Sequence, residues 1–195
     1  MRKLLIQFFL VLLCGTATAQ TGTSSPYSSA ALGELQFGGF TQHMGKGGLS
    51  RAEVGKNNFS PLNPATYANI DFTVYDAGMK TNLGTLQTTT DEAAVSAGNF
   101  SHFGMAFPFN TPKGMGVSFG LYQYTDVGYD IRNAVNDAVP SYYNLFRGNG
   151  GINRVYAGYG VEIFKNLNLG VNFNYNFGSI QSLSAKVYPN TDTHF

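Results

Sequence analysis

The stretch Leu167 to Phe177 limits the fold most strongly, because apolar and polar residues alternate along it without a break. Every odd position is Leu, Val, Phe or Tyr, and every even position is Asn or Gly. Side chains of a β-strand point alternately to opposite faces, so this stretch forms a strand with one apolar and one polar face. A strand of a soluble sandwich looks similar, but the length here matches the roughly 9–11 residues that a tilted strand needs to cross an outer membrane.

The preceding stretch supplies a partner for this strand. Odd positions from Val155 to Ile163 are apolar, whereas Arg154 and Glu162 fall on the other face. A barrel lumen tolerates such charges, but an Arg at the lipid midplane costs about 2–4 kcal/mol. A hairpin with its turn at 164–166 brings the two apolar faces together and predicts three opposed pairs: Ile163 with Leu167, Val161 with Leu169, and Tyr159 with Val171.

The composition favours the same architecture. Charged residues make up 12% of the chain and aromatic residues 14%, whereas a soluble domain usually carries about 25% charged residues. A net charge of +1 argues against nucleic acid as a partner. No segment reaches the roughly 18 apolar residues of a membrane-spanning helix. The sequence therefore predicts an all-β protein, a transmembrane antiparallel β-barrel whose outer surface contacts membrane lipid.

Residues 1–19 have the features of an export signal. Two basic residues precede an apolar core from Leu4 to Leu13, and a motif of small residues ends at Ala19. Cys14, the only cysteine, raises the alternative of a lipid anchor, but the bulky residue before it disfavours that alternative. We expect cleavage near Ala19 and location in the bacterial outer membrane.

Residues 20–69 differ from the rest of the chain in having no clean period. Glycine pairs and the motif from Ser60 to Pro64 interrupt regular structure. One interpretation is a disordered lead-in. The other is a plug that folds into the barrel lumen, which the many hydrophobic residues favour: Phe37, Phe40, Leu49, Val54, Phe59, Leu62 and Tyr67.

The region 70–195 reads as the first strands of the barrel. Long and short connections alternate, as they do in outer-membrane barrels, with 81–94 and 128–151 as long external loops and 110–113 and 165–166 as short periplasmic turns. We count five strands and a sixth candidate from Ile180 to Val187. Since a transmembrane barrel needs about eight strands, we expect this chain to be an N-terminal part of a longer protein.

The motif from Asn57 to Tyr67 resembles the plug segment of the FadL-type outer-membrane transporters (the OMPP1/FadL/TodX family), where an Asn-Pro-Ala triplet precedes the first strand. The resemblance implies a barrel of about fourteen strands. It also implies a lumen hatch that includes Asn63, Pro64 and Ala65, and passive uptake of long-chain fatty acids or aromatic hydrocarbons. Some relatives of this fold serve protein secretion instead. Three more segments are similar to a divergent branch of the family: 25–28, 120–129 and 148–156.

Other motifs offer little chemistry. The segment Gly116 to Gly120 spells the nucleophile elbow of hydrolases, but it lies inside an alternating strand instead of a strand-to-helix turn. The three histidines lack the spacing of metal ligands, and His102 reads as a polar residue of the lumen face. Three tyrosines form a candidate ligand path, although we favour an aromatic girdle near the outer interface: Tyr122, Tyr124 and Tyr129.

We therefore predict a passive outer-membrane transporter of hydrophobic, fatty-acid-like small molecules, plugged by residues 20–69. The alternative is an outer-membrane barrel with a structural or secretion-accessory role and with secretion or assembly partners. A small closed barrel with an adhesive or structural function is a third interpretation, which requires the chain to be complete. None of these interpretations includes an enzyme activity, a cofactor or a metal.

Overall fold

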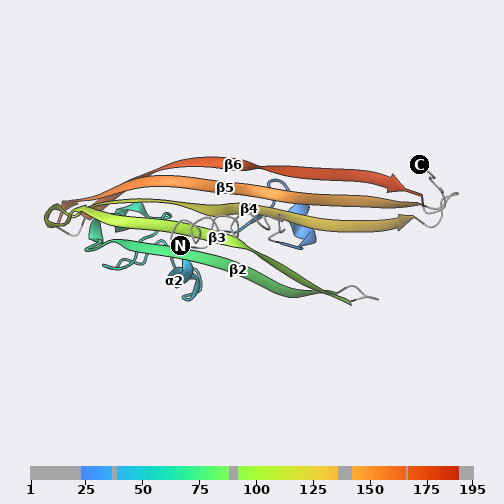
Figure 1. The fold of residues 1–195 in the computed structure, drawn as a ribbon, viewed down its shortest axis with the longest axis horizontal. Coiled ribbons are helices and arrows are strands. Elements are labelled where there is room, and N and C mark those ends of the chain that lie inside the picture. The colour runs from blue at the N-terminus through green and yellow to red at the C-terminus, as the bar shows by residue number, and fades with distance from the viewer. Residues whose placement is uncertain (1–22, 37–38, 88–91, 136–141, 166, 189–195) are drawn as a thin grey trace, which may run out of the picture.

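The structure, a computed structural model, describes residues 23–36, 39–87, 92–135, 142–165 and 167–188. The predicted export signal lies outside these residues. One antiparallel sheet dominates, with its long strands in the order β2-β3-β4-β5-β6 (Figure 1). The strands are β2 (Val74–Gln87), β3 (Glu92–Asn110), β4 (Met115–Val135), β5 (Tyr142–Phe164) and β6 (Leu167–Val187).

The β5–β6 hairpin has the predicted register over most of its length. Val161 pairs with Leu169 and Tyr159 pairs with Val171, as the two apolar faces require. The predicted pair of Ile163 with Leu167 is wrong, because a bulge next to the turn shifts the register and Phe164 pairs with Leu167 instead. Apolar periodicity therefore fixed the register everywhere except beside the turn.

The two long external loops are largely strand, so that prediction is wrong. Gln87 pairs with Glu92 at the tip of one hairpin, and Val135 pairs with Tyr142 at the tip of another. The candidate sixth strand is also wrong as a separate element, since 180–187 continues β6. Backbone hydrogen bonds extend a hairpin whatever the side-chain period, so polar composition did not mark the ends of these strands. The short turn at 110–113 is confirmed, with the 3₁₀ turn η3 at Thr111–Lys113.

The sheet has two chemically different faces. We call the face that carries the N-terminal segment the inner face, and the opposite one the outer face. Along β6 the large odd-numbered side chains lie on the outer face and are exposed, and Phe173 has 81% of its surface exposed. The inner face of the neighbouring strands contains small or buried residues such as Gly158, Tyr156 and Ser118.

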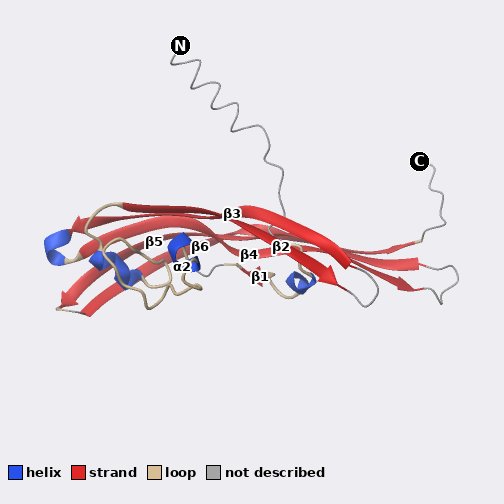
Figure 2. Ribbon diagram, turned by 90° about the horizontal axis from the view of Figure 1, so that it is seen from below, coloured by secondary structure: helices blue, strands red, loops and turns tan. Residues whose placement is uncertain are grey.

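The N-terminal segment, of which residues 23–36 and 39–73 are described, lies against the inner face (Figure 2). It contains η1 (Pro26–Ser29), β1 (Glu34–Leu35), α2 (Thr41–Met44) and η2 (Pro64–Asn69). A disordered lead-in is therefore the wrong interpretation for the described part of this segment. The main core forms between the segment and the sheet, from Phe40, Phe59, Tyr67 and Ile70 with Ala106, Tyr122 and Tyr156.

β2 and β6 are the outermost strands of the sheet. The all-β class and the antiparallel arrangement are confirmed, whereas closure into a barrel and a plug inside a closed lumen are not shown. Within the described ranges, no helix is long and apolar enough to cross a membrane.

Candidate functional site

A surface of glycines on β4, β5 and β6 holds η2. A Cβ atom added at Gly160 would lie 2.7 Å from the carbonyl oxygen of Pro64 and 2.9 Å from the backbone nitrogen of Ala68. These contacts involve backbone atoms, which cannot rotate away as a side chain does. We call this surface the glycine platform: Gly116, Gly158, Gly160 and Gly170.

The Asn-Pro-Ala motif starts η2 at the edge of the platform. The side-chain nitrogen of Asn63 donates to the carbonyl of Arg51 at 2.7 Å, and the carbonyl of Asn63 accepts from the backbone nitrogen of Thr66 at 3.1 Å. Pro64 occupies the first position of the turn, where its fixed φ suits the conformation and no N–H is needed. Together with Ala65, Pro64 rests on Gly170. A hatch role for the three motif residues remains a prediction.

Tyr67 connects η2 to β6 through a hydrogen bond. Its hydroxyl donates to the side-chain oxygen of Asn172 at 3.1 Å, and the amide of Asn172 donates to the carbonyl of Pro61 at 2.6 Å. Burial raises the pKa of Tyr67 well above its ordinary value, because the phenolate would lose its hydration. Tyr67 is thus a neutral donor that ties the segment to the sheet.

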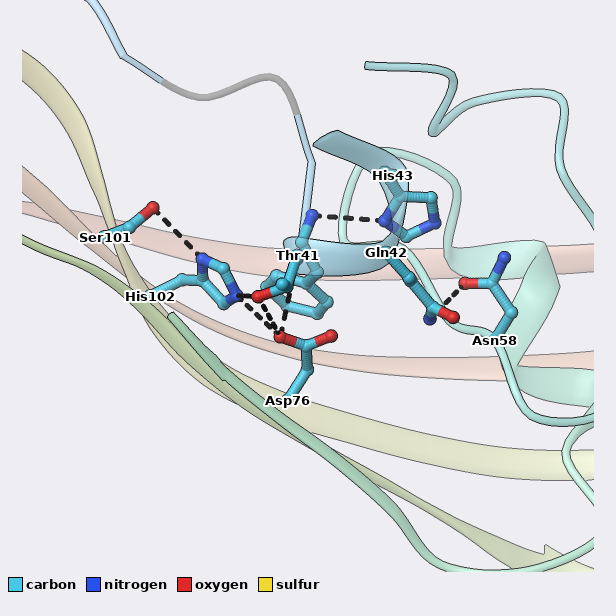
Figure 3. Close-up of polar contacts among 8 residues, drawn as sticks. Thr41, Gln42, His43, Asn58, Asp76, Ser101 and His102 are labelled. Atoms are coloured by element: carbon cyan, nitrogen blue, oxygen red, sulfur yellow. Dashed lines mark hydrogen bonds and ion pairs between the residues drawn. The ribbon is translucent and has the colours of Figure 1, made fainter. Parts of the chain in front are cut away.

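A second cluster of polar contacts joins α2 to β2 and β3 (Figure 3). Nε2 of His102 lies 2.8 Å from Oδ1 of Asp76, and the Thr41 hydroxyl donates to the same oxygen at 2.9 Å. Nδ1 of His102 lies 3.1 Å from the hydroxyl of Ser101. The ring of Phe40 stacks on the imidazole at a centroid distance of 4.8 Å. Sequence reasoning did not connect His102 with Asp76 or Thr41, since these two partners come from the separate elements β2 and α2.

This cluster contains Ser, His and Asp, the residue types of a hydrolase triad, but a substrate cannot reach its imidazole. His102 is only 2% exposed, and with Phe40 stacked on its ring no space is left for a substrate beside the imidazole. The other serine considered, Ser118, donates to the carbonyl of Met105 at 3.0 Å and lies within β4. The described residues also contain no group of His, Cys, Asp and Glu able to hold a metal ion. Ser118 thus joins β4 to β3, whereas Ser101 contacts the imidazole of the adjacent His102.

The three candidate ligand-path tyrosines occupy different surroundings. Tyr122 is buried in the core under the N-terminal segment. The guanidinium of Arg154 lies 3.8 Å from the ring centroid of Tyr124, which is a cation–π contact. Tyr129 lines a cavity farther along β4. Tyr122 and Tyr124 pack with the inner-face core, whereas a girdle would contact lipid on the outer face. A role in a ligand path remains an untested prediction.

The cavity that contains Tyr129 has a volume of about 810 Å³. It lies between the start of the N-terminal segment, the tip of the β2–β3 hairpin, and the far parts of β4 to β6. Apolar side chains of Leu86, Val95 and Leu183 line it, together with the charged residues Asp130 and Arg147. Sequence reasoning did not find it, because its walls come from regions interpreted as loops.

Comparison with protein families bears on the functional interpretations. The sequence matches the model of the BamG family over residues 1–195. The chain belongs to the BamG family. BamG is related to the Bam complex, so membership implies a protein associated with the bacterial outer membrane. No curated protein and no solved structure matches the chain.

Membership of the BamG family corrects the predicted family and the predicted function. The resemblance to the FadL-type transporters is wrong, because the family that matches the whole chain is a different one. The predicted passive transport of fatty-acid-like or aromatic small molecules is wrong for the same reason, and a hydrophobic small molecule as partner is not supported. The alternative, a structural or secretion-accessory role, agrees better with the BamG family.

Proposed function

We propose that this chain is a membrane-embedded accessory component of the Bam assembly complex. In this proposal the sheet forms part of a transmembrane β-barrel, and the N-terminal segment fills the inner face of that barrel. The role is structural, with protein partners from the assembly machinery and no catalytic step.

The observation that carries the proposal is the exposed apolar outer face. Soluble monomers rarely expose a contiguous apolar patch of more than a few hundred Å², but here exposed large hydrophobic side chains cover all five long strands. Lipid is the environment in which such a face is stable. The exposed side chains are Tyr75, Met79, Leu83, Phe103, Phe119, Val155, Leu169, Val171, Phe173 and Tyr175.

The distribution of charge along the strands also supports a sheet that is embedded in lipid near its short turns. Near the short turns the outer face is apolar, whereas the far ends of β4 and β5 have exposed charges at Asp130, Arg132 and Arg147. An apolar band is roughly 25 Å tall and takes about 9–11 residues of a tilted strand. β4 and β5 are about twice that long, so their far halves extend beyond the membrane.

The outermost strands require partners in this environment. Each unpaired backbone group in lipid costs several kcal/mol, and β2 and β6 each have one edge without a neighbouring strand in the described sheet. Further strands, from the same protein or from a partner, therefore complete the sheet in the membrane. A component of an assembly complex has such partners available.

The test is purification of the tagged full-length protein from native outer membranes in mild detergent after chemical crosslinking. The expected result is a stable complex with Bam components identified by mass spectrometry, and reduced levels of other outer-membrane barrels when the protein is depleted. A parallel extraction with alkaline carbonate tests membrane insertion separately. If no Bam component co-purifies and depletion leaves other barrels at normal levels, the accessory role is wrong, whatever the extraction shows.

A further inference from the structure

The sheet divides between β3 and β4. Pairing of these strands starts at the short turn and ends with His102 opposite Tyr122. Beyond this point β2 and β3 leave the rest of the sheet, as Figure 1 shows. The side chains of Asn99 and Gln123 still contact each other just past the division. Beyond Tyr122 the far half of β4 therefore lacks β3 as a neighbour, and this edge of β4 is open to other segments.

The N-terminal segment covers the first part of this exposed edge. β1 pairs antiparallel with it, with Leu35 opposite Thr125 and Glu34 opposite Asp126. The backbone nitrogen of Gln36 donates to the carbonyl of Tyr124 at 3.1 Å. The edge of β4 thus already accepts one extended segment of polypeptide.

This cover ends at Gly128, whose backbone nitrogen donates to the hydroxyl of Ser28 at 3.1 Å. In an antiparallel ladder the backbone groups of every second residue point to the same side. Since the N–H of Gly128 points away from β5, the backbone groups of Asp130, Arg132 and Ala134 point away from β5 as well. No other described strand pairs with β4 at these three residues.

The cavity of about 810 Å³ adjoins this open edge, since Tyr129 and Asp130 line it. Its walls combine apolar residues with Asp130 and Arg147. Two guanidinium nitrogens of Arg147, Nε and Nη2, donate to Oδ2 of Asp130 at 3.0 and 2.6 Å. Arg132 has only a longer bond of 3.4 Å to the same carboxylate, and 64% of its side chain is exposed. Two guanidiniums therefore face one carboxylate, and Arg132 remains available to an added acidic group.

We propose that the edge of β4 from Asp130 to Ala134 is a docking site for an extended, acidic and apolar segment of a partner protein. The segment adds as a strand in continuation of β1. Its backbone pairs with the outward-pointing groups of β4, its apolar side chains enter the cavity, and a carboxylate meets Arg132. This inference rests on the fold and does not depend on Bam membership.

The test uses purified full-length protein in detergent and a short fluorescent peptide of alternating Val and Glu, with binding measured by polarisation. Ala134→Pro removes one edge N–H and blocks strand addition, at a position where an edge strand tolerates proline. Ala134→Ser is the matched control that keeps the N–H. We expect Ala134→Pro to weaken binding about tenfold or more and Ala134→Ser to leave it unchanged.

The second part of the test changes the charge of the site and of the peptide. Arg132→Gln is expected to weaken the Val–Glu peptide about tenfold, and a Val–Lys peptide to bind the wild type at least about tenfold more weakly. No binding at about 1 mM peptide, equal affinity for the two peptides, or normal binding by the proline variant would each overturn the proposal. If the wild type instead self-associates through this edge and Ala134→Pro abolishes that, the occupant is a second copy and the partner segment is wrong.

Discussion

Gly160→Ala tests how η2 is held on the sheet. The added Cβ would lie 2.7 Å from the carbonyl oxygen of Pro64, 2.9 Å from the nitrogen of Ala68, and 3.0 Å from the Cβ of Tyr67. Ordinary contacts of such atoms begin near 3.4 Å, so η2 must move away by several tenths of an ångström. Overpacking of this kind costs about 1–3 kcal/mol.

Hydrogen exchange measures this cost directly. The amides of Thr66 and Ile70 are protected by bonds to the carbonyls of Asn63 and Tyr67, at 3.1 and 3.4 Å. If η2 opens locally, a loss of 1–3 kcal/mol raises their exchange rate by roughly 5- to 150-fold. The assay is exchange read by mass spectrometry on peptides covering 59–70 of the full-length protein.

Gly84→Ala is the matched control, because it also replaces a strand glycine. Its added Cβ meets only a side-chain atom of Val95, at 3.7 Å. Any general effect of removing a glycine, about 0.4–1 kcal/mol through the unfolded chain, appears in both variants. Equal exchange of residues 59–70 in the two variants would refute the glycine platform as the support of η2.

Three further predictions concern the outer face, the segment and its pH response. Phe173→Lys is expected to destabilise the protein in lipid vesicles by about 2–4 kcal/mol, whereas Asn174→Lys, on the inner face, changes stability little in the same denaturant titration. Tyr67→Phe removes one hydrogen bond to β6 and is expected to cost about 0.5–1.5 kcal/mol in thermal unfolding. Burial lowers the pKa of His43 from 6.5, and its Nδ1 accepts the backbone N–H of Phe40 at 3.1 Å, so the folded state favours the neutral ring. Protection of α2 is therefore expected to fall as the pH drops below about 6.5, where the unfolded chain binds more protons, and a His43→Gln variant lacks this response.

The parts of the strands near the short turns were predictable because one pattern, the alternation of apolar and polar residues, runs through all of them. An apolar side chain at every second position defines one face of each strand, so Val161 and Leu169 were expected on the same face, and they pair as predicted. In the far halves of the strands this alternation is less regular. β4 continues as far as Val135 through backbone pairing with β5, and the polar composition of its far half led to the wrong prediction of a loop.

The inner face could be predicted only in outline. A local motif revealed Asn63 and Pro64, but the contact of η2 with Gly160 joins segments about a hundred residues apart. The bond between Asp76 and His102 likewise joins two strands whose spacing in sequence has no metal or catalytic signature. Short motifs also misled the choice of family, since a triplet such as Asn-Pro-Ala reports how a turn begins and not what the protein does.

The inner face holds the two ends of the N-terminal segment with very different strength. η2 is fixed by buried Tyr67 and by backbone contact with the glycine platform, so its release requires several tight contacts to break. β1 pairs through only two residues, and Leu35 is 70% exposed, so its displacement removes little buried area. A partner strand that extends the β1 ladder therefore meets a weakly held neighbour while the segment as a whole stays anchored. Strand docking at β4 and anchoring at η2 are thus separable, and Gly160→Ala should loosen η2 without changing the affinity of the edge for its peptide.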